Sequence, residues 1–274
     1  MHIQTMLTSV LCGSLLACGP STEPSPAAPS PTVQATAPEL GSSPPPASSS
    51  AASIAAAVAH PGRPQDDRVR DNDRRPAEVM TFLGVEPGMA IADLQTGRGY
   101  YAELFARTVG ATGKVYAQNN AFVVKRFADK PLADRLARLG FDHLVRIDRE
   151  LETLGFPEGT LDLVHIGLFY HDTYWQKVDR AAMNRSILSA LKPGGIYAIV
   201  DHHAEVGSGE RDVKTLHRGD AAQIKAEVLA AGFEWVGESE LLGHPEDDRK
   251  TNVFAPAIRG KTDRFIYKFR KPSK

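Results

Sequence analysis

The sequence contains the segment Asp93-Leu94-Gln95-Thr96-Gly97-Arg98-Gly99-Tyr100, from which the fold can be predicted. An apolar run, Met89–Leu94, leads into it and predicts a buried strand. From Tyr101 to Val109, apolar side chains recur at the spacing of one helix face. An acid therefore ends a strand, and two glycines turn the chain into a helix. Because glycine adopts positive φ and has no side chain, such a turn lets a ligand approach the backbone.

Strand-like and helix-like runs alternate on both sides of this turn. Short apolar runs predict seven strands at residues 89–94, 114–117, 144–147, 161–169, 196–200, 233–242 and 264–269. Helices are predicted at residues 77–83, 101–109, 131–139 and 177–191 and after the capping residue Asp220, whereas residues 61–76, rich in Arg and Asp, predict an exposed lead-in. The alternation predicts an α/β fold with a Rossmann-like, doubly wound, mostly parallel seven-stranded sheet and an antiparallel C-terminal strand. Ligands of such sheets bind at the carboxyl ends of the strands.

Polar residues follow the later strands in a definite order. Asn119, Asp148 and Tyr170-His171-Asp172 end the second, third and fourth strands, and Lys192-Pro193-Gly194-Gly195 precedes the fifth. Over residues 61–274 this order resembles the class I S-adenosylmethionine (SAM) methyltransferases. Short motifs further resemble exported bacterial proteins described only as predicted methyltransferases: His60-Pro61, Gly99-Tyr100-Tyr101, Tyr170-His171-Asp172, Gly207-Ser208-Gly209, Thr215-Leu216-His217-Arg218 and Asn252-Val253-Phe254.

The resemblance assigns cofactor contacts residue by residue. It implies that the first strand and its turn border the methionine part of SAM through Asp93, Gln95, Gly97, Gly99 and Tyr100. It implies that Asn119 meets the ribose, that Asp148 accepts from the adenine amine, and that Tyr170, His171 and Asp172 line the transfer site. Two positions depart from the family pattern. Gln95 replaces the first glycine of the turn, and Asn119 replaces an acid, which removes a charge-assisted hydrogen bond.

Histidines and acids gather after the fourth and fifth predicted strands. His171 and Asp172 follow the fourth, and Asp201, His202 and His203 follow the fifth. Because these strand ends are neighbours, we expect His171, Asp172, Asp201 and His202 to be catalytic, with His171 as the first choice of general base. Structural histidines in ordinary hydrogen bonds are the alternative. A divalent metal is also possible, but it is not favoured because no His-x-x-x-His spacing is present.

The N-terminal residues predict export rather than folding. Met6–Ala17 is apolar but too short to span a membrane, and Leu15-Leu16-Ala17-Cys18 resembles the bacterial lipobox. Residues 1–17 are therefore expected to be a signal peptide, and Cys18 is expected to carry lipid. Residues 18–60 are rich in Ser, Pro and Ala and predict a disordered tether to a domain at 61–274. Gly19 after the cysteine favours the outer membrane in a Gram-negative host.

The sequence thus predicts a SAM-dependent methyltransferase acting on a small-molecule acceptor. A net charge of −1 without a long basic block argues against nucleic acid or an anionic membrane surface as partner, so membrane contact is expected only through the lipid. One alternative is a small-molecule binding module without catalysis, because SAM is made in the cytoplasm. Another is an NAD(P)-dependent oxidoreductase, because Gly97-x-Gly99-x-x-Ala102 also fits the dinucleotide fingerprint. The acceptor and the oligomeric state stay open.

Overall fold

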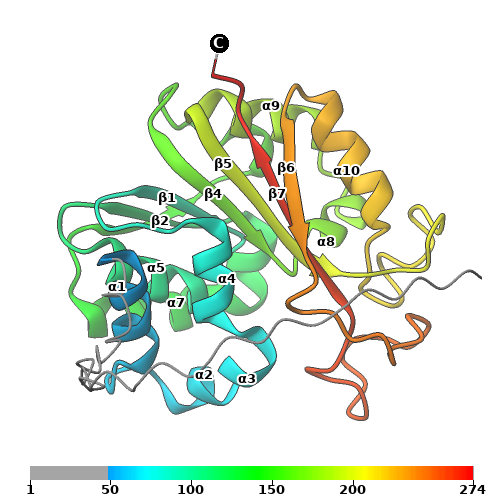
Figure 1. Cartoon of the computed structure of the whole chain (residues 1–274), viewed down its shortest axis with the longest axis horizontal. Helices are drawn as coiled ribbons and strands as arrows, with labels where there is room; N and C mark the ends of the chain where they lie inside the picture. Colours follow the sequence, from blue (N-terminus) through cyan, green and yellow to red (C-terminus); the bar gives the residue numbers. More distant parts are fainter. Residues whose placement is uncertain (1–48, 274) are drawn as a thin grey trace, which may run out of the picture. The chain divides into compact units, whose positions relative to one another are not determined.

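A computed structural model describes residues 49–273, which form a layered α/β domain (Figure 1). Its sheet contains β1 (Ala90–Leu94), β2 (Lys114–Asn119), β3 (Leu144–Asp148), β4 (Leu161–Gly167), β5 (Leu191–His202), β6 (Glu234–Ser239) and β7 (Arg264–Arg270). The strand order is β3-β2-β1-β4-β5-β7-β6. Strands β1 to β5 are parallel, and β7 runs antiparallel to both β5 and β6. The predicted fold class is confirmed. The antiparallel β7 between β5 and β6 departs from the 3-2-1-4-5-6 order of dinucleotide-binding domains.

Helices cover both faces of the sheet. They are α1 (Ser49–Ala59), α2 (Gln65–Val69), α3 (Asp71–Arg74), α4 (Pro76–Leu83), α5 (Tyr100–Val109), α6 (Ala121–Val123), α7 (Asp129–Leu139), α8 (Tyr170–Trp175), α9 (Arg180–Ala190) and α10 (Ala221–Ala230), with short helical turns at Val124–Ala128 and Leu151–Thr153. Successive residues of a strand point to opposite faces. In β5, Tyr197 and Ile199 join the core under α8, α9 and α10, whereas Ala198 and Val200 join the core under α1, α4 and α5.

The folded domain begins earlier than the sequence predicted. Residues Ser49–Ala59 form α1, which contacts α4 and α5 and buries Ile54 and Ala57 to 2% and 3% exposure. Alanine is the strongest helix former, and Ile54 gives this Ala-rich segment an apolar anchor. The expectation of a disordered tether is therefore wrong for residues 49–59. The rest of the tether, the signal peptide and Cys18 lie outside the described residues.

The expected lead-in at residues 61–76 is exposed over much of its length, but it also contains α2 and α3. Several of its charged side chains are paired. Arg63 is buried and donates to both carboxylate oxygens of Asp71, at 2.7 and 2.8 Å. Asp67 accepts from Arg135 of α7 at 2.6 Å. Composition alone did not reveal the pair of Asp67, because its partner lies 68 positions later in the sequence.

Two helix starts follow their capping residues. Asp220 accepts from the amides of Ala222 and Gln223, at 3.1 and 3.4 Å, and confirms the predicted start of α10. The helix predicted at 177–191 is shorter in the structure, where α9 begins at Arg180. Asp179 caps its start by accepting a hydrogen bond from the Ala182 amide at 2.9 Å. Among the described residues, no helix combines the length and apolarity needed to span a membrane.

Candidate active site

The sheet brings the predicted site residues to the carboxyl ends of its parallel strands. In the register, Asp93 of β1 stands beside His165 of β4, and Asn119 of β2 stands beside Asp148 of β3. His171 and Asp172 follow β4 in α8, and Asp201 and His202 end β5. Two groups of residues result. We call residues 95–99 the glycine turn, and His171, Asp172, Asp201 and His217 the histidine cluster.

The glycine turn is held open by a buried amide. Asn119 accepts from the Gly97 amide at 2.9 Å and donates to the Gly97 carbonyl at 3.1 Å. Gly97 has a φ of +59°, and a Cβ built on it would meet no atom within 4 Å. The space in front of Gly97 is therefore free for a ligand. Asn119 is buried and shapes this turn, a role beyond the ribose contact that the resemblance implied.

Gln95 keeps the backbone shape of the glycine that it replaces. Its φ is +50°, a region that residues other than glycine seldom adopt. The side chain is 5% exposed, and its Oε1 accepts from the Asn120 amide at 3.3 Å. The Asn120 side chain donates in turn to Gln176 at 3.1 Å. Within residues 49–273, the Nε2 groups of Gln95 and Gln176 are buried without a partner. Buried donors of this kind suit a ligand that offers oxygen or nitrogen acceptors.

Asp93 is fixed by a histidine that the sequence analysis did not select. Its Oδ1 lies 2.7 Å from His165 Nδ1, and Thr96 donates its hydroxyl to Oδ2. Both Asp93 and His165 are buried, and the His165 ring lies 4.7 Å from the Tyr101 ring. The only sequence signal was a histidine inside the apolar run of β4. The pair secures the end of β1 next to the glycine turn.

Gly99 and Tyr100 attach the glycine turn to neighbouring helices. A Cβ on Gly99 would lie 3.0 Å from Leu132 and from Arg135, so this glycine permits α5 to pack against α7. Arg135 also donates to the carbonyl of Arg98 at 2.6 Å. Tyr100 donates its hydroxyl to Asp71 of α3 at 2.7 Å. Gly99 and Tyr100, which were predicted to contact the cofactor, therefore join the glycine turn to α7 and α3.

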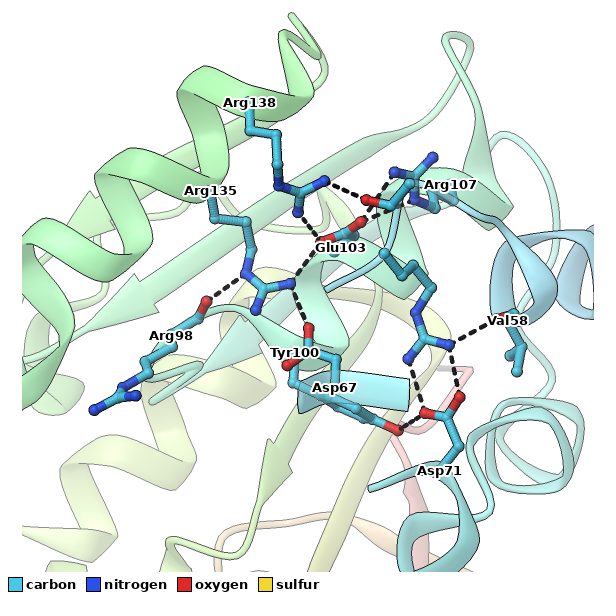
Figure 2. Close-up of polar contacts among 11 residues, drawn as sticks. Val58, Asp67, Asp71, Arg98, Tyr100, Glu103, Arg107, Arg135 and Arg138 are labelled. Carbon is cyan, nitrogen blue, oxygen red and sulfur yellow. Dashed lines mark hydrogen bonds and ion pairs between the residues drawn. The ribbon is translucent and has the colours of Figure 1, made fainter. Parts of the chain in front are cut away.

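A network of arginines around Glu103 continues this support (Figure 2). Glu103 is 1% exposed and pairs with Arg107 at 2.9 Å and with Arg135 and Arg138 at 2.5 Å. Burial alone would raise the pKa of Glu103. The hydrogen bonds from Arg138 and Arg107 and the charge of Arg135 outweigh burial and lower it. The carboxylate thus ties α5 to α7 directly behind the glycine turn.

Two more predicted cofactor residues lie in different surroundings. Asp148 is exposed at the end of β3, where Arg146 lies 2.8 Å from its carboxylate. Tyr170, in contrast, is fully buried, and its hydroxyl contacts Asn184 at 3.0 Å and Glu227 at 3.3 Å. The Tyr170 side chain packs in the core under α9 and α10, so its assignment as a cofactor contact is wrong.

The histidine cluster joins three segments of the chain. Asp201, with 0% exposure, accepts from the His171 amide at 2.8 Å and lies 2.7 Å from His171 Nδ1. On the other side of the ring, His171 Nε2 lies 3.2 Å from Asp172 Oδ1 and 3.4 Å from His217 Nδ1. His217 Nδ1 lies 3.2 Å from the same Asp172 oxygen. His171, Asp172 and Asp201 lie close together, as expected from the sequence, and His217 is the fourth member of the group.

The charges of the cluster change the expected role of His171. Burial would lower the pKa of His171, but the charge of Asp201 and hydrogen bonds with Asp172 and Asp201 raise it to about 10. Burial would raise the pKa of Asp172, but hydrogen bonds from His171 and His217 hold it well below its usual range. These contacts favour the charged form of His171 near pH 7. A charged histidine must first lose its proton before it can act as the expected general base.

His202 and His203 are less closely connected with the cluster. The His202 ring centre lies 6.2 Å from that of His171, and Thr262 Oγ1 lies 2.9 Å from His202 Nδ1. Burial, followed by the nearby positive charge of His171, places the pKa of His202 well below its usual value. His203 packs against Phe265, with ring centres 4.9 Å apart. His202 therefore adjoins the cluster as a neutral side chain, and His203 belongs to its surroundings.

His217 is held in place by its neighbour in the sequence. Arg218, with 0% exposure, donates to both oxygens of Asp247, at 2.8 and 3.0 Å, and to the carbonyls of Thr251 and His203 at 3.0 Å. His217 itself has a φ of +54°. His217 could not be assigned a role from the sequence, because it lies in a loop 46 positions after His171.

Comparisons with known proteins find methyltransferases among the similar chains. No family model matches the chain. The UbiE C-methyltransferase of ubiquinone/menaquinone biosynthesis from Laribacter hongkongensis is 27% identical over 191 residues, which cover 68% of this chain and 72% of that relative. A SAM-dependent methyltransferase from Aquifex aeolicus has a TM-score of 0.52 and 19% identity and covers 71% of this chain and 88% of that one. An arsenic(III) SAM methyltransferase from Chlamydomonas reinhardtii has a TM-score of 0.50 and 18% identity. The match covers 84% of this chain and 74% of that one.

Proposed function

We propose that this chain, a member of the class I SAM-dependent methyltransferase superfamily, binds SAM at the glycine turn and transfers its methyl group to a small-molecule acceptor beside the histidine cluster. The observation that carries the proposal is the open backbone at Gly97, at the carboxyl end of β1 in a sheet of this order. Ligands of open α/β sheets bind at this edge.

The residues around the turn fit such a cofactor. Space in front of Gly97 admits a ligand against the backbone, and a bulky residue there would fill it. The unpartnered amides of Gln95 and Gln176 can donate to the oxygens or ring nitrogens of SAM. Asp148 is exposed and can accept from an adenine amine. Asn119 keeps Gly97 in its left-handed conformation, so the turn is formed before the ligand arrives.

Much of the rate of methyl transfer comes from positioning. SAM supplies a methyl group on a positively charged sulfur, and the acceptor must approach it in line. The chain holds His171 through two contacts with Asp201, which lies at the end of β5, the strand next to β4. Asp172 and His202 add a carboxylate and a neutral imidazole to the same side of the site. These groups can orient an acceptor and receive its proton.

The acceptor is proposed to be a small molecule. The near-neutral net charge of −1 offers little attraction for nucleic acid. The relative from Laribacter hongkongensis is named for quinone biosynthesis, which is a pathway of small molecules. Binding of SAM without turnover of any small acceptor would favour the alternative of a binding module.

Calorimetry of the purified chain with SAM and with S-adenosylhomocysteine tests the cofactor site. The informative variant is Gly97→Asn, because Asn tolerates a left-handed backbone while its side chain occupies the open space. Gly140→Asn is the matched control, since Gly140 also has a φ of +59° and open space but ends α7. We expect Gly97→Asn to weaken binding at least tenfold and the control to bind as the wild type does. Absence of heat with both ligands at millimolar concentration would overturn the proposal.

We infer from the lipobox-like sequence Leu15-Leu16-Ala17-Cys18 that the mature chain is an exported lipoprotein that begins at acylated Cys18. Gly19 favours the periplasmic face of the outer membrane in a Gram-negative host. Replacement of Cys18 by Ser should release the protein from the membrane fraction. Unchanged retention of that variant would contradict the inference.

A further inference from the structure

The histidine cluster contains a triangle of ligand atoms from two distant segments. Asp172 Oδ1 lies 3.2 Å from His171 Nε2 and 3.2 Å from His217 Nδ1. The two imidazole nitrogens, His171 Nε2 and His217 Nδ1, lie 3.4 Å apart. Imidazole nitrogens and carboxylate oxygens bind divalent transition metals at about 2.0–2.2 Å. At octahedral or tetrahedral angles, that bond length separates neighbouring ligand atoms by about 2.8–3.6 Å. All three edges of the triangle match the separation that a shared metal ion requires.

The surroundings of the triangle also suit a metal ion. Asp201 lies 2.7 Å from His171 Nδ1, which leaves His171 Nε2 directed at the other two ligand atoms. A carboxylate behind a ligating histidine is a regular feature of metal sites, because it fixes the ring and makes its nitrogen a better ligand. Asp201 is fully buried and Asp172 is partly buried, so two carboxylates converge where a cation would offset their charge.

The third ligand is held independently of the first two. Arg218 is buried and bound to Asp247 and to two backbone carbonyls, and it fixes the backbone beside His217. Trp175 donates its indole N–H to Asp172 Oδ1 at 2.7 Å and steadies the carboxylate. The ligands therefore sit on supported segments before any metal arrives, as metal sites require.

We propose that His171, Asp172 and His217 bind one divalent first-row transition-metal ion. Two imidazoles and one carboxylate suit Fe²⁺, Mn²⁺, Co²⁺ or Zn²⁺. Three protein ligands leave coordination positions for water or for an oxygen of a substrate. The site goes beyond methyl transfer, because metal binding by these residues does not depend on SAM. A metal was not favoured from the sequence because no His-x-x-x-His spacing is present, and only the fold brings residues 171, 172 and 217 together.

The test is a titration of the purified, chelator-treated full chain with Zn²⁺ and with Co²⁺. Calorimetry measures affinity and stoichiometry, and the visible absorption of Co²⁺ reports the ligands. The wild type should bind one ion per chain at micromolar concentration or below. His217→Asn, which tolerates the φ of +54°, and Asp172→Asn should each weaken binding at least tenfold, since loss of even a supporting residue costs 10–100-fold.

His143→Asn is the control, because His143 contacts the Ala106 carbonyl beside β3 and lies outside the triangle. It should bind as the wild type does. Circular dichroism checks that each variant is folded. The proposal is overturned if the wild type binds neither ion at millimolar concentration, or if folded His217→Asn and Asp172→Asn keep wild-type affinity. Titration with SAM in the absence of metal tests the cofactor site separately.

Discussion

The glycine turn and the histidine cluster lie at the same edge of one sheet, but they are built by different means. The glycine turn presents backbone, and neutral amides of Asn119 and Gln95 shape it. The charged groups next to this turn are Glu103 and the arginines of α5 and α7, which pair with one another. The histidine cluster presents side chains, and its own members carry the charge. One region thus suits binding of a ligand against the main chain, and the other suits proton or metal chemistry.

The difference also separates what each region contributes to activity. If the glycine turn holds the cofactor and the histidine cluster serves the acceptor, a change in one should leave the property of the other intact. A change that affects both equally would mean that the two regions form one inseparable unit.

Replacement of His171 by Ala should have the largest effect on turnover. The variant removes the ring between Asp201 and the other cluster residues, and we expect turnover to fall roughly 10²–10⁴-fold, the scale of losing an acid–base group. Affinity for SAM should stay unchanged, because His171 lies outside the glycine turn. The assay follows formation of S-adenosylhomocysteine with the small-molecule fraction of a bacterial extract as acceptor source. Equal turnover by the variant and the wild type would remove His171 from the mechanism.

Replacement of Glu103 by Gln should instead affect stability. The carboxylate is buried among Arg107, Arg135 and Arg138, and its loss leaves these charges without their shared partner. Breaking a buried ion pair costs about 3–5 kcal/mol, and we expect the lower end because Arg135 keeps its contact with Asp67. Urea unfolding followed by circular dichroism measures the loss. A variant as stable as the wild type would show that the network only fills space behind the turn.

The same carboxylate predicts a pH dependence of stability. The folded state lowers the pKa of Glu103 below the value of about 4.3 for an unfolded chain. Its contribution is therefore complete above about pH 5 and is lost as the pH falls through the folded pKa. The difference in unfolding free energy between wild type and Glu103→Gln should shrink between pH 5 and pH 3, as two pH series of urea unfolding would measure. A difference that stays constant over this range would contradict the lowered pKa.

The fold and the glycine turn could be predicted from the sequence because their signals are local. The strand end at Asp93, the glycines and the helix from Tyr100 are consecutive, and Asp220 caps its helix within three residues. Apolar alternation alone indicated β7 and its antiparallel direction. The site residues Gly97 and Asn119 were found through the same pattern, although the amide contact that joins them required the structure.

The remaining features depend on contacts between distant residues. His217 reaches His171 only because the buried pair Arg218–Asp247 fixes its loop. The segment before residue 76 packs through a hydrogen bond from Tyr100 of α5 and an ion pair with Arg135 of α7, which composition alone does not reveal. Tyr170 and His171 are consecutive in the sequence, but neighbouring residues of a helix point in different directions. The Tyr170 side chain therefore packs in the core. Sequence spacing does not determine such directions.

A crystal structure of the chain grown with S-adenosylhomocysteine would show where the cofactor product binds. We predict that the ligand lies over Gly97, with Gln95 or Gln176 donating to it and its adenine near Asp148. Asn119 should keep its two contacts with Gly97. A ligand bound elsewhere on the chain, with the ends of β1 and β2 free, would contradict the account.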